Sequence, residues 1–355
     1  MEQHIRILKA LHGDSFILNC VKGLQHGTIV VDGGPYRDNY KIVQILEEYE
    51  SIDLMVVTHY DDDHIGGLLA YIEKHKDDRP FPIKEIWVNC SRQIPVSNTG
   101  NISFNQAKKL SNLLFDINKD LEEKGLPTVT WEPLILAGQR VQRPYADFLI
   151  LSPEEESLSL NFFNFNSECG DISSRRSRQK SVLTKSLQEL STVAKKKVNL
   201  QNKQEVINLS SIAFVVSCDS FSALMMGDSY PSTIIKTLES NGFNNSDNRL
   251  RVSYTKIAHH GSAKNTSNTL LDMLECDTYI ISTNGGNGVS CHPDRETIGN
   301  IAWHPNRNHN SPVNLVFNYP MGTIESIGYK FLNEGECDKD GSYINVYSNI
   351  DKLPV

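Results

Sequence analysis

Four side chains that can bind a metal occupy six positions of one segment, Thr58–Gly67, which reads Thr-His-Tyr-Asp-Asp-Asp-His-Ile-Gly-Gly. They are His59, Asp61, Asp63 and His64. Imidazole and carboxylate together bind borderline or hard divalent ions such as Zn, Mn or Fe. Carboxylates that cluster away from water repel one another unless a cation neutralises them. The segment therefore predicts a metal site, and the alternative is an Asp-rich turn that caps a helix.

Several other β-rich runs end in a residue that can bind a metal or form a turn. The residues at these ends are Asp32, Asp228, His259 and His260. Ligand sites in α/β proteins form beyond the ends of strands. Each of these segments alone is more often a simple turn or loop, but their joint occurrence in one chain favours a shared site.

Strand-like and helix-like patterns alternate along most of the chain. Apolar runs predict strands over 53–58 and 83–89, and helical spacing predicts helices over 67–75 and 104–124. Such alternation is typical of α/β layering. We expect one domain over residues 1–355, with a polar, basic insertion at about 154–205 and a β-rich C-terminal tail at about 312–355.

Composition indicates an ordinary soluble protein, with 39% hydrophobic and 22% charged residues. No apolar run approaches the length of about 18 residues that spans a membrane, and no secretory leader is evident. Seven scattered cysteines without a CxxC pair favour a reducing compartment, so we expect a cytoplasmic protein. The net charge of −8 argues against indiscriminate nucleic-acid binding.

These segments resemble the metallo-β-lactamase superfamily, and more narrowly the soluble hydrolase domain of ComEC-type competence proteins. The resemblance runs in family order from residue 11 to about 303 and leaves out the insertion and the end of the tail. The Asp/His cluster followed by Gly-Gly and the His-His-Gly-Ser run are together highly specific. The other matching segments are Leu11-His-Gly-Asp-Ser-Phe-Ile-Leu, Val30-Val-Asp-Gly-Gly, Asn208-Leu-Ser-Ser-Ile, Met226-Gly-Asp-Ser and Cys291-His-Pro.

The resemblance implies a four-layer αββα sandwich with one or two divalent ions at one edge. His59 and Asp61 would serve one metal, and Asp63, His64 and His260 the other. Asp228 would bridge both, and Asp32 would support the ligand loop. Two ions about 3.5–4 Å apart would hold a hydroxide for in-line attack, which Asp63 could orient or deprotonate.

Two departures from the broader superfamily affect the first metal site. Asp61 stands where many members have a second histidine, and the third-motif histidine is missing, with Asn208 or a neighbouring serine near its place. ComEC-type members look similar here. Oxygen in place of imidazole makes the site harder, so Mn and Mg join Zn as candidate ions, and a single-metal enzyme stays open.

Residues beside the predicted ligands have two interpretations each. His259 is either a ligand or a group that orients one. His292 either gives a proton to the leaving group or contacts phosphate, and otherwise it is a loop histidine. Ser262, Lys264 and Asn265 either bond phosphate oxygens or cap the next helix.

The expected substrate is a phosphodiester in DNA, RNA or a nucleotide. The insertion supports this with eight basic residues against one acidic residue over 175–197, including Lys195, Lys196 and Lys197. Such a run can hold a polyanion, or it is only a solvated helix face. A hydrolase of esters, lactones or thioesters and a non-catalytic metal-containing binding module are the alternatives. A regulatory protein partner is compatible with the insertion, and no membrane is expected.

Overall fold

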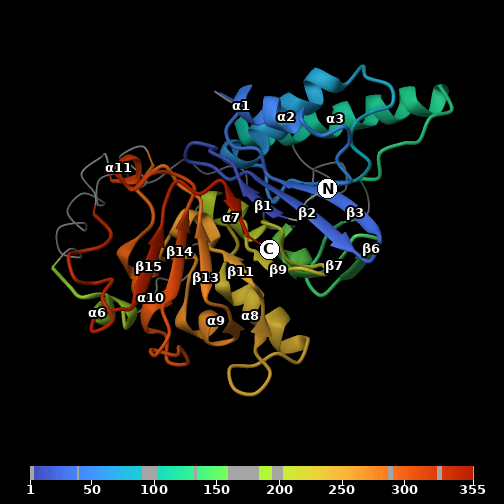
Figure 1. The fold of residues 1–355 in the computed structure, drawn as a ribbon. Helices are drawn as coiled ribbons and strands as arrows, with labels where there is room; N and C mark the ends of the chain where they lie inside the picture. The colour runs from blue at the N-terminus through green and yellow to red at the C-terminus, as the bar shows by residue number, and fades with distance from the viewer. Residues whose placement is uncertain are drawn as a thin grey trace.

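The computed structural model describes residues 4–37, 40–89, 102–131, 134–158, 184–193, 203–286, 291–325 and 330–354. Two β-sheets face each other, and helices lie on the outer side of each sheet (Figure 1). Among the described residues, no helix combines the length and apolar character that crossing a bilayer requires.

The first sheet has six strands in the order β16-β1-β2-β3-β4-β5. Their bounds are β16 Lys352–Leu353, β1 His4–Ile7, β2 Phe16–Lys22, β3 Gln25–Val31, β4 Leu54–Val56 and β5 Ile86–Trp87. The pairs from β16 to β3 are antiparallel, and β3, β4 and β5 are parallel. Three helices cover its outer face: α1 Tyr40–Leu46, α2 Asp62–His75 and α3 Ile102–Glu123.

The second sheet has eight strands in the order β15-β14-β13-β11-β9-β8-β7-β6. Their bounds are β15 Ile344–Tyr347, β14 Val313–Phe317, β13 Thr278–Ile281, β11 Tyr254–Lys256, β9 Ser222–Met225, β8 Ala213–Ser217, β7 Ala146–Ser152 and β6 Arg140–Arg143. Strands from β9 to β15 pair in parallel, and β6 to β9 are antiparallel.

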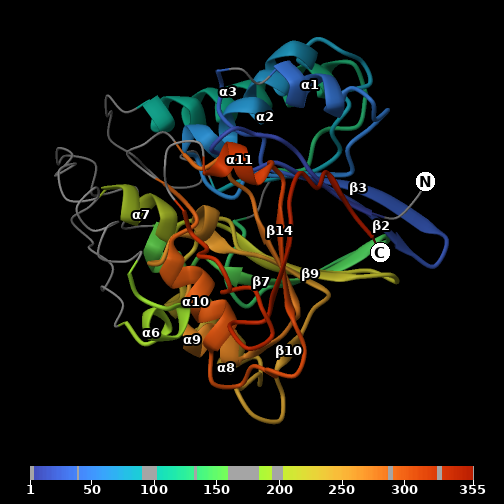
Figure 2. The same cartoon turned by 60° about the vertical axis from the view of Figure 1, so that its left-hand side comes forward.

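Helices α8 Pro231–Ser240, α9 Asn268–Asp272 and α10 Arg295–Trp303 lie on the outer side of the second sheet (Figure 2). Helix α6 Leu187–Ser191 packs on α10. The remaining elements are a parallel pair, β10 Leu250–Arg251 and β12 Leu274–Glu275, with α7 Lys203–Leu209, α11 Met321–Ile324 and a 3-10 turn, η1 Ala258–Gly261.

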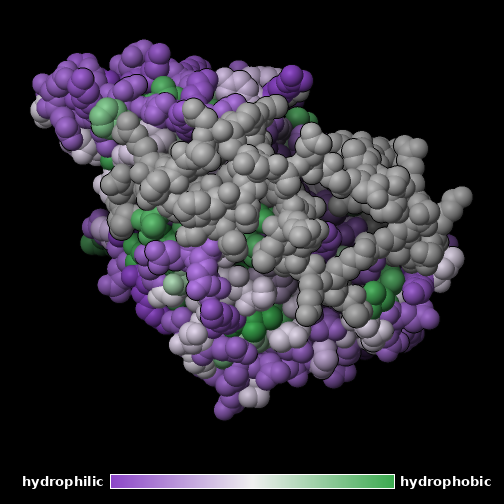
Figure 3. Space-filling model, turned by 180° about the vertical axis from the view of Figure 1, so that it is seen from behind, coloured by the Kyte–Doolittle hydropathy of each residue, from purple (hydrophilic) through white to green (hydrophobic). Residues whose placement is uncertain are grey.

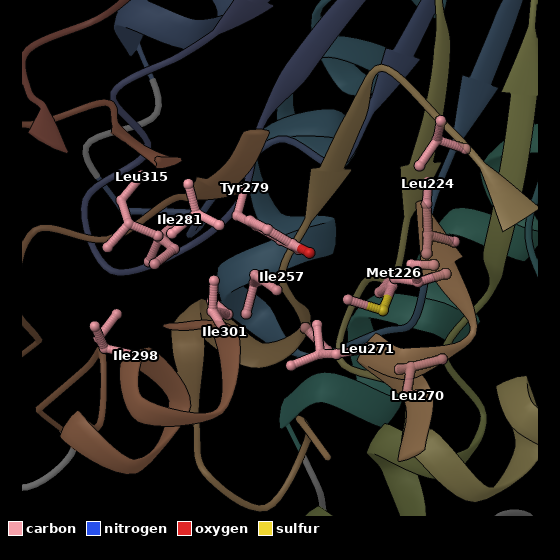
Figure 4. Close-up of a cluster of buried hydrophobic side chains, with 14 of the residues drawn as sticks. Leu224, Met226, Ile257, Leu270, Leu271, Tyr279, Ile281, Ile298, Ile301 and Leu315 are labelled. Carbon is pink, nitrogen blue, oxygen red and sulfur yellow. The ribbon is translucent and has the colours of Figure 1, made fainter. Parts of the chain in front are cut away.

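Alternating side chains divide the core into three layers. Phe16 and Leu18 of β2 and Phe214 and Val216 of β8 point into the space between the two sheets. The intervening residues point outward, so Val215 joins a separate cluster under α8–α10. Figure 4 shows this outer cluster, in which side chains of the sheet meet those of α9 and α10. A third cluster joins α1–α3 to the first sheet.

Most large apolar side chains of the described residues are buried, and the described surface is mainly hydrophilic. Seen from behind, most described surface residues are hydrophilic, and hydrophobic ones form small separate patches (Figure 3). The large hydrophobic side chains that are exposed come from different parts of the chain: Leu24, Tyr36, Tyr40, Phe115, Val193 and Tyr347.

The predicted αββα layering is confirmed, and element boundaries show the differences. Helix α2 begins at Asp62, five residues before the predicted start, because acidic residues at a helix N-terminus favour helix initiation. The predicted strand over 83–89 shrinks to Ile86–Trp87. Of the insertion, 159–183 and 194–202 fall outside the described residues, including Lys195, Lys196 and Lys197.

Candidate metal centre

The predicted ligands lie at one edge of the sandwich, where strands of both sheets end. Asp32 follows β3, and His59 follows β4, its parallel neighbour. Asp228 follows β9, and His260 follows β11, again parallel neighbours. Parallel strands bring their carboxyl ends to the same edge of a sheet, which is why these distant segments meet. Asp63 and His64 occupy the first turn of α2.

Six side chains converge at this edge. His59 Nε2 lies 3.3 Å from Asp61 Oδ2 and 4.0 Å from Asp228 Oδ2. His64 Nε2 lies 3.4 Å from Asp228 Oδ1, and His260 Nε2 lies 3.4 Å from Asp63 Oδ2. His64 Nε2 is also 4.0 Å from Asp63 Oδ2. Asp228 therefore stands between a half formed by His59 and Asp61 and a half formed by Asp63, His64 and His260.

Four buried atoms of this cluster have no hydrogen-bond partner among the described residues. They are His59 Nε2, His64 Nε2, His260 Nε2 and Asp228 Oδ1. Buried polar atoms are almost always paired, so a group of unpaired ones that face each other indicates a site that fits a cation. Three imidazole nitrogens and a carboxylate oxygen are ligands of divalent zinc, manganese or iron. The residues present therefore fit one or two divalent ions.

Hydrogen bonds to the other ring nitrogen orient each histidine. His64 Nδ1 lies 2.8 Å from Asp32 Oδ2, and His260 Nδ1 lies 3.0 Å from the carbonyl oxygen of Ser282. His59 Nδ1 lies 3.1 Å from Thr58 Oγ1, which itself donates to Asp32 at 2.7 Å. Protons on the three Nδ1 atoms satisfy all these bonds and leave each Nε2 lone pair for a metal. Asp32 thus contacts both Thr58 and His64, and its support of the ligand loop, which the resemblance implies, stays a prediction.

The backbone of the ligand loops adopts left-handed conformations. The φ angles are 57° at Asp32, 50° at His259 and 55° at His260. Outside glycine, such conformations cost on the order of 1–3 kcal/mol each and persist where surrounding structure holds them.

Gly227, with φ of 49°, precedes Asp228, and a Cβ there would lie 2.3 Å from Ser211 Oγ. That hydroxyl accepts the Asp228 N–H at 2.9 Å and so fixes the ligand.

Comparison with known proteins identifies this architecture. Residues 15–134 match the family model for the metallo-β-lactamase superfamily. This chain has the metallo-β-lactamase fold. The matched part is a metallo-β-lactamase superfamily domain, and it contains β2 to β5 with Asp32, His59, Asp61, Asp63 and His64.

Solved structures similar to this metallo-β-lactamase fold share little sequence with it. The metallo-β-lactamase fold protein YhfI from Bacillus subtilis is 10% identical, with a TM-score of 0.42 and 100% coverage of both chains. CmlA, a diiron β-hydroxylase from Streptomyces venezuelae, is 11% identical, with a TM-score of 0.43 over 100% of this chain and 54% of that chain. The chain thus spans about half the length of CmlA. Similarities this low carry no argument about the reaction, and no curated protein matches the sequence.

Carboxylates around the histidines of the centre favour the protonated forms of these histidines in the absence of a cation. Burial lowers the pKa of His64, but Asp228, Asp32 and Asp63 outweigh it and raise that pKa well above its ordinary value. Burial also lowers the pKa of His260, but the Asp14 carboxylate outweighs burial, and the pKa of His260 rises to about 10. A divalent ion that takes the Nε2 positions must displace these protons, so metal binding is expected to release protons.

Two buried residues of the centre were not predicted from the sequence. Lys256, 1% exposed on β11, contacts the Asp14 carboxylate and donates to the Gly227 carbonyl at 2.9 Å. Asp14 Oδ1 lies 3.4 Å from His260 Nδ1, and Asp14 Oδ2 lies 4.0 Å from His64 Nδ1. A lysine inside a buried strand is rare unless it is paired, so Lys256 was the signal in the sequence.

His259 lies beside the Asp228 carboxylate, and Asn208 and His292 are neighbours of His259. His259 Nε2 lies 3.7 Å from Asp228 Oδ2, and its Nδ1 lies 3.1 Å from Asn208 Nδ2. The His259 and His292 ring centroids are 5.5 Å apart. The structure therefore brings Asn208, His259 and His292 to the centre together, as neighbours of the six ligand candidates.

The three residues after the histidine pair differ in position. Asn265 is 1% exposed, and its amide donates to the carbonyl oxygens of Asp228 at 2.8 Å and Ser229 at 3.2 Å. It lies behind the Asp228 loop and holds the main chain there. Lys264 is partly exposed and pairs with Glu205, whereas Ser262 is buried with its N–H bonded to His259.

Proposed function

We propose that this protein is a metal-dependent hydrolase that cleaves phosphodiester bonds in DNA, RNA or a nucleotide. The observation that carries this proposal is the convergence of unpaired buried ligand atoms from His59, His64, Asp228 and His260. When bound, one or two divalent ions, Zn or Mn with Mg as a further candidate, would activate water and share the charge of the transition state.

The candidate ligands differ in how far their side chains are exposed to solvent. His59 and His64 have fully buried side chains, whereas the Asp63 side chain is 25% exposed. Asp63 is thus the ligand candidate that water and substrate reach, which suits it to orient or deprotonate the attacking water. We propose that His292, whose ring centroid lies 5.5 Å from that of His259, gives a proton to the leaving group.

The oxygen-rich set of candidate ligands favours a phosphodiester substrate over a carboxylic ester. Asp61, Asp63 and Asp228 give the centre three carboxylates beside its imidazoles, and carboxylate oxygens suit the harder ions that support phosphoryl transfer. The ComEC-type resemblance of the motifs supports the same substrate class. Nucleic acid or a nucleotide is therefore the partner that we propose, with the basic insertion as a candidate contact for the phosphate backbone.

A metal-reconstitution experiment tests the proposal. The purified protein is stripped with a chelator, and Mn, Zn or Mg is restored one at a time. Turnover is then measured on bis(p-nitrophenyl) phosphate, DNA, RNA and cyclic dinucleotides, and in parallel on a panel of esters, lactones and thioesters. We expect phosphodiester cleavage, with Mn at least as effective as Zn, because Asp61 replaces a histidine.

The same panel distinguishes the alternatives. Cleavage confined to the ester, lactone or thioester panel would assign a small-molecule hydrolase. A protein that binds metal stoichiometrically yet turns over none of these substrates would be a binding module. Rescue by Zn alone would contradict Asp61 as a ligand.

A further inference from the structure

Two cysteines face each other across the space between the sheets. In β2, Phe16, Leu18 and Cys20 alternate toward this inter-sheet core, and Phe214 and Val216 of β8 do the same from the other side. Cys218 continues the β8 alternation just beyond the strand end and packs on the same core. Both thiols are free. The period of two therefore directs one thiol from each sheet into the same layer.

Main-chain hydrogen bonds hold the two strands together at this point. The Asp219 N–H donates to the Val21 carbonyl at 2.9 Å, one residue beyond each cysteine. The Asp219 carboxylate also accepts the Gly23 N–H at 2.7 Å. The Cys218 thiol, which donates to the Phe221 carbonyl at 3.5 Å, packs on the same core cluster as Cys20. Two cysteines that belong to one core cluster, on segments tied together by these bonds, are an arrangement from which a disulfide can form.

We propose that Cys20 and Cys218 are a redox modification site that forms a reversible disulfide between the two sheets when the protein meets a peroxide. The Cys218 thiolate attacks one peroxide oxygen, the O–O bond breaks, and the products are a sulfenic acid and hydroxide or alkoxide, which takes up the thiol's proton. The Cys20 sulfur then attacks the Cys218 sulfur, the S–O bond breaks, and water leaves. The thiols lose two electrons, and the peroxide gains them.

The order of attack follows from the surroundings of the two thiols. Cys20 is 1% exposed, whereas Cys218 is only partly buried. The hydrogen bond from Cys20 is the main cause that lowers the pKa of Cys218 to about 6, while Cys20 itself has a raised pKa. The thiolate form is the nucleophile, so Cys218 reacts first and Cys20 resolves the sulfenic acid.

This pair lies at the opposite end of the strands from the metal centre. Cys20 pairs with Gly27, four residues along β2 from the Phe16–Val31 pair that precedes Asp32. At about 3.3 Å per residue, that separation is roughly 13 Å along the strand. The inference therefore stands independently of the proposed hydrolase activity.

Peptide mapping of the oxidised full-length protein tests the inference. The protein is treated with hydrogen peroxide, free thiols are alkylated, and the digest is analysed by mass spectrometry without reduction. We expect a peptide that links Cys20 to Cys218, a loss of two alkylatable thiols relative to the untreated protein, and full recovery with dithiothreitol.

Single variants make the test specific. Cys20→Ser should leave Cys218 as a sulfenic acid that dimedone traps, and Cys218→Ser should leave Cys20 unmodified. Cys276→Ser, which removes a partly buried cysteine elsewhere, should form the same link as the unmodified sequence. The proposal is overturned if peroxide converts Cys218 to a sulfinic acid without a link to Cys20, leaves Cys218 reduced, or links Cys218 to another cysteine.

Discussion

At the scale of single residues, the centre is ordered by contacts around its ligands. Asp32 receives the Thr58 N–H at 2.8 Å and the His64 Nδ1 at 2.8 Å, so one carboxylate positions both the strand end and a ligand ring. Asn265 and Ser211 hold the main chain around Asp228 in the same way. Ligands that are positioned before a cation arrives lose little conformational freedom on binding it.

Substitution of His64 should remove metal and activity together. His64→Ala deletes the ring that faces both Asp228 and Asp63, and we expect metal affinity and turnover to fall at least about 100-fold, since loss of a supporting residue alone costs 10–100-fold. Asp63→Ala should abolish turnover with the fold retained. Elemental analysis and turnover on bis(p-nitrophenyl) phosphate measure both effects.

His75→Ala is the matched control. It removes another histidine of α2, whose ring bonds Asp78 at 2.6 Å and Glu47 at 3.1 Å far from the centre. Metal content and turnover should stay at the level of the unmodified protein. Ordinary metal content in His64→Ala would refute its assignment as a ligand.

The buried pair of Lys256 and Asp14 should matter for stability. Lys256→Met leaves the Asp14 carboxylate, 1% exposed, without its cation, and we expect a loss of about 3–5 kcal/mol in the free energy of unfolding. Urea denaturation measures it. Lys84→Met is the control, because Lys84 pairs with Asp53 at the surface, and it should cost less than about 1 kcal/mol.

A second substitution separates charge from packing. Asp14→Asn combined with Lys256→Met removes both charges, so the double variant should be more stable than the sum of the single losses predicts. Strict additivity would mean that the two residues do not interact.

At the scale of elements, the N-terminus of α2 serves the metal centre and the packing of the first sheet together. Asp61 precedes the helix, yet its side chain makes no capping hydrogen bond and instead faces His59. Asp62 in the first turn accepts the Gln106 amide at 2.6 Å, which ties α2 to α3. Acidic residues here are also stabilised by the helix dipole.

Helix α2 packs closely against the loop at Gly33, so Gly67→Ala should destabilise the fold rather than stabilise it. In most helices Gly→Ala stabilises by up to about 1 kcal/mol. A Cβ at Gly67 would lie 2.0 Å from the Gly33 carbonyl oxygen, so Gly67→Ala must separate helix and loop. We expect a loss of about 1–3 kcal/mol by urea denaturation.

Gly322→Ala provides the comparison. Gly322 is in α11, and a Cβ there would meet no atom within 4 Å. This variant should be neutral or slightly more stable. If Gly67→Ala were as stable as Gly322→Ala, the helix would not rest on the Gly33 loop.

At the scale of the whole molecule, the C-terminal tail joins separate parts of the fold. Strand β15 adds to the second sheet beside β14, and β16 then adds to the first sheet beside β1. Arg295 of α10, fully buried, donates to Glu336 at 2.6 and 2.8 Å and to the carbonyl oxygens of Phe331 and Lys185 at 2.9 Å. This guanidinium thus connects α10 to the tail and to Lys185 of the predicted insertion.

The Arg295–Glu336 pair predicts a pH-dependent stability. Burial raises the pKa of Glu336, but hydrogen bonds from Arg295 and the Asn333 N–H outweigh it and lower that pKa below its ordinary value. A lowered folded-state pKa stabilises the fold above the unfolded-state value of about 4.3, and the stabilisation is lost as pH falls through the folded-state pKa.

Glu336→Gln should show this dependence directly. Above about pH 5 the variant should be less stable by about 1.5–3 kcal/mol, and the difference should shrink below about pH 4 as the native carboxylate takes up a proton. Urea denaturation across this pH range measures it. A difference that is constant with pH would show that the charge of Glu336 does not contribute.

The sequence by itself identified the candidate ligands and predicted the layered fold. The Asp/His segment after β4 and the His-His-Gly segment after β11 named His59, Asp61, Asp63, His64 and His260, because residue types and spacing are local properties. Strand and helix periods predicted α/β layering, and the resemblance to the metallo-β-lactamase superfamily implied the two covered sheets. The start of α2 was less accurate, because the acidic first turn at Asp62 and Asp63 lies before the apolar spacing from which the helix was predicted.

Only the tertiary structure decided which residues complete the centre. Lys256 and Asp14 are 242 positions apart, and only the sheet arrangement places that buried lysine against that carboxylate. The same holds for Cys20 and Cys218, whose contact depends on how one sheet lies over the other. A charged residue within an apolar strand shows in the sequence that it needs a partner, but the identity of that partner follows from strand order and register, which long-range packing sets.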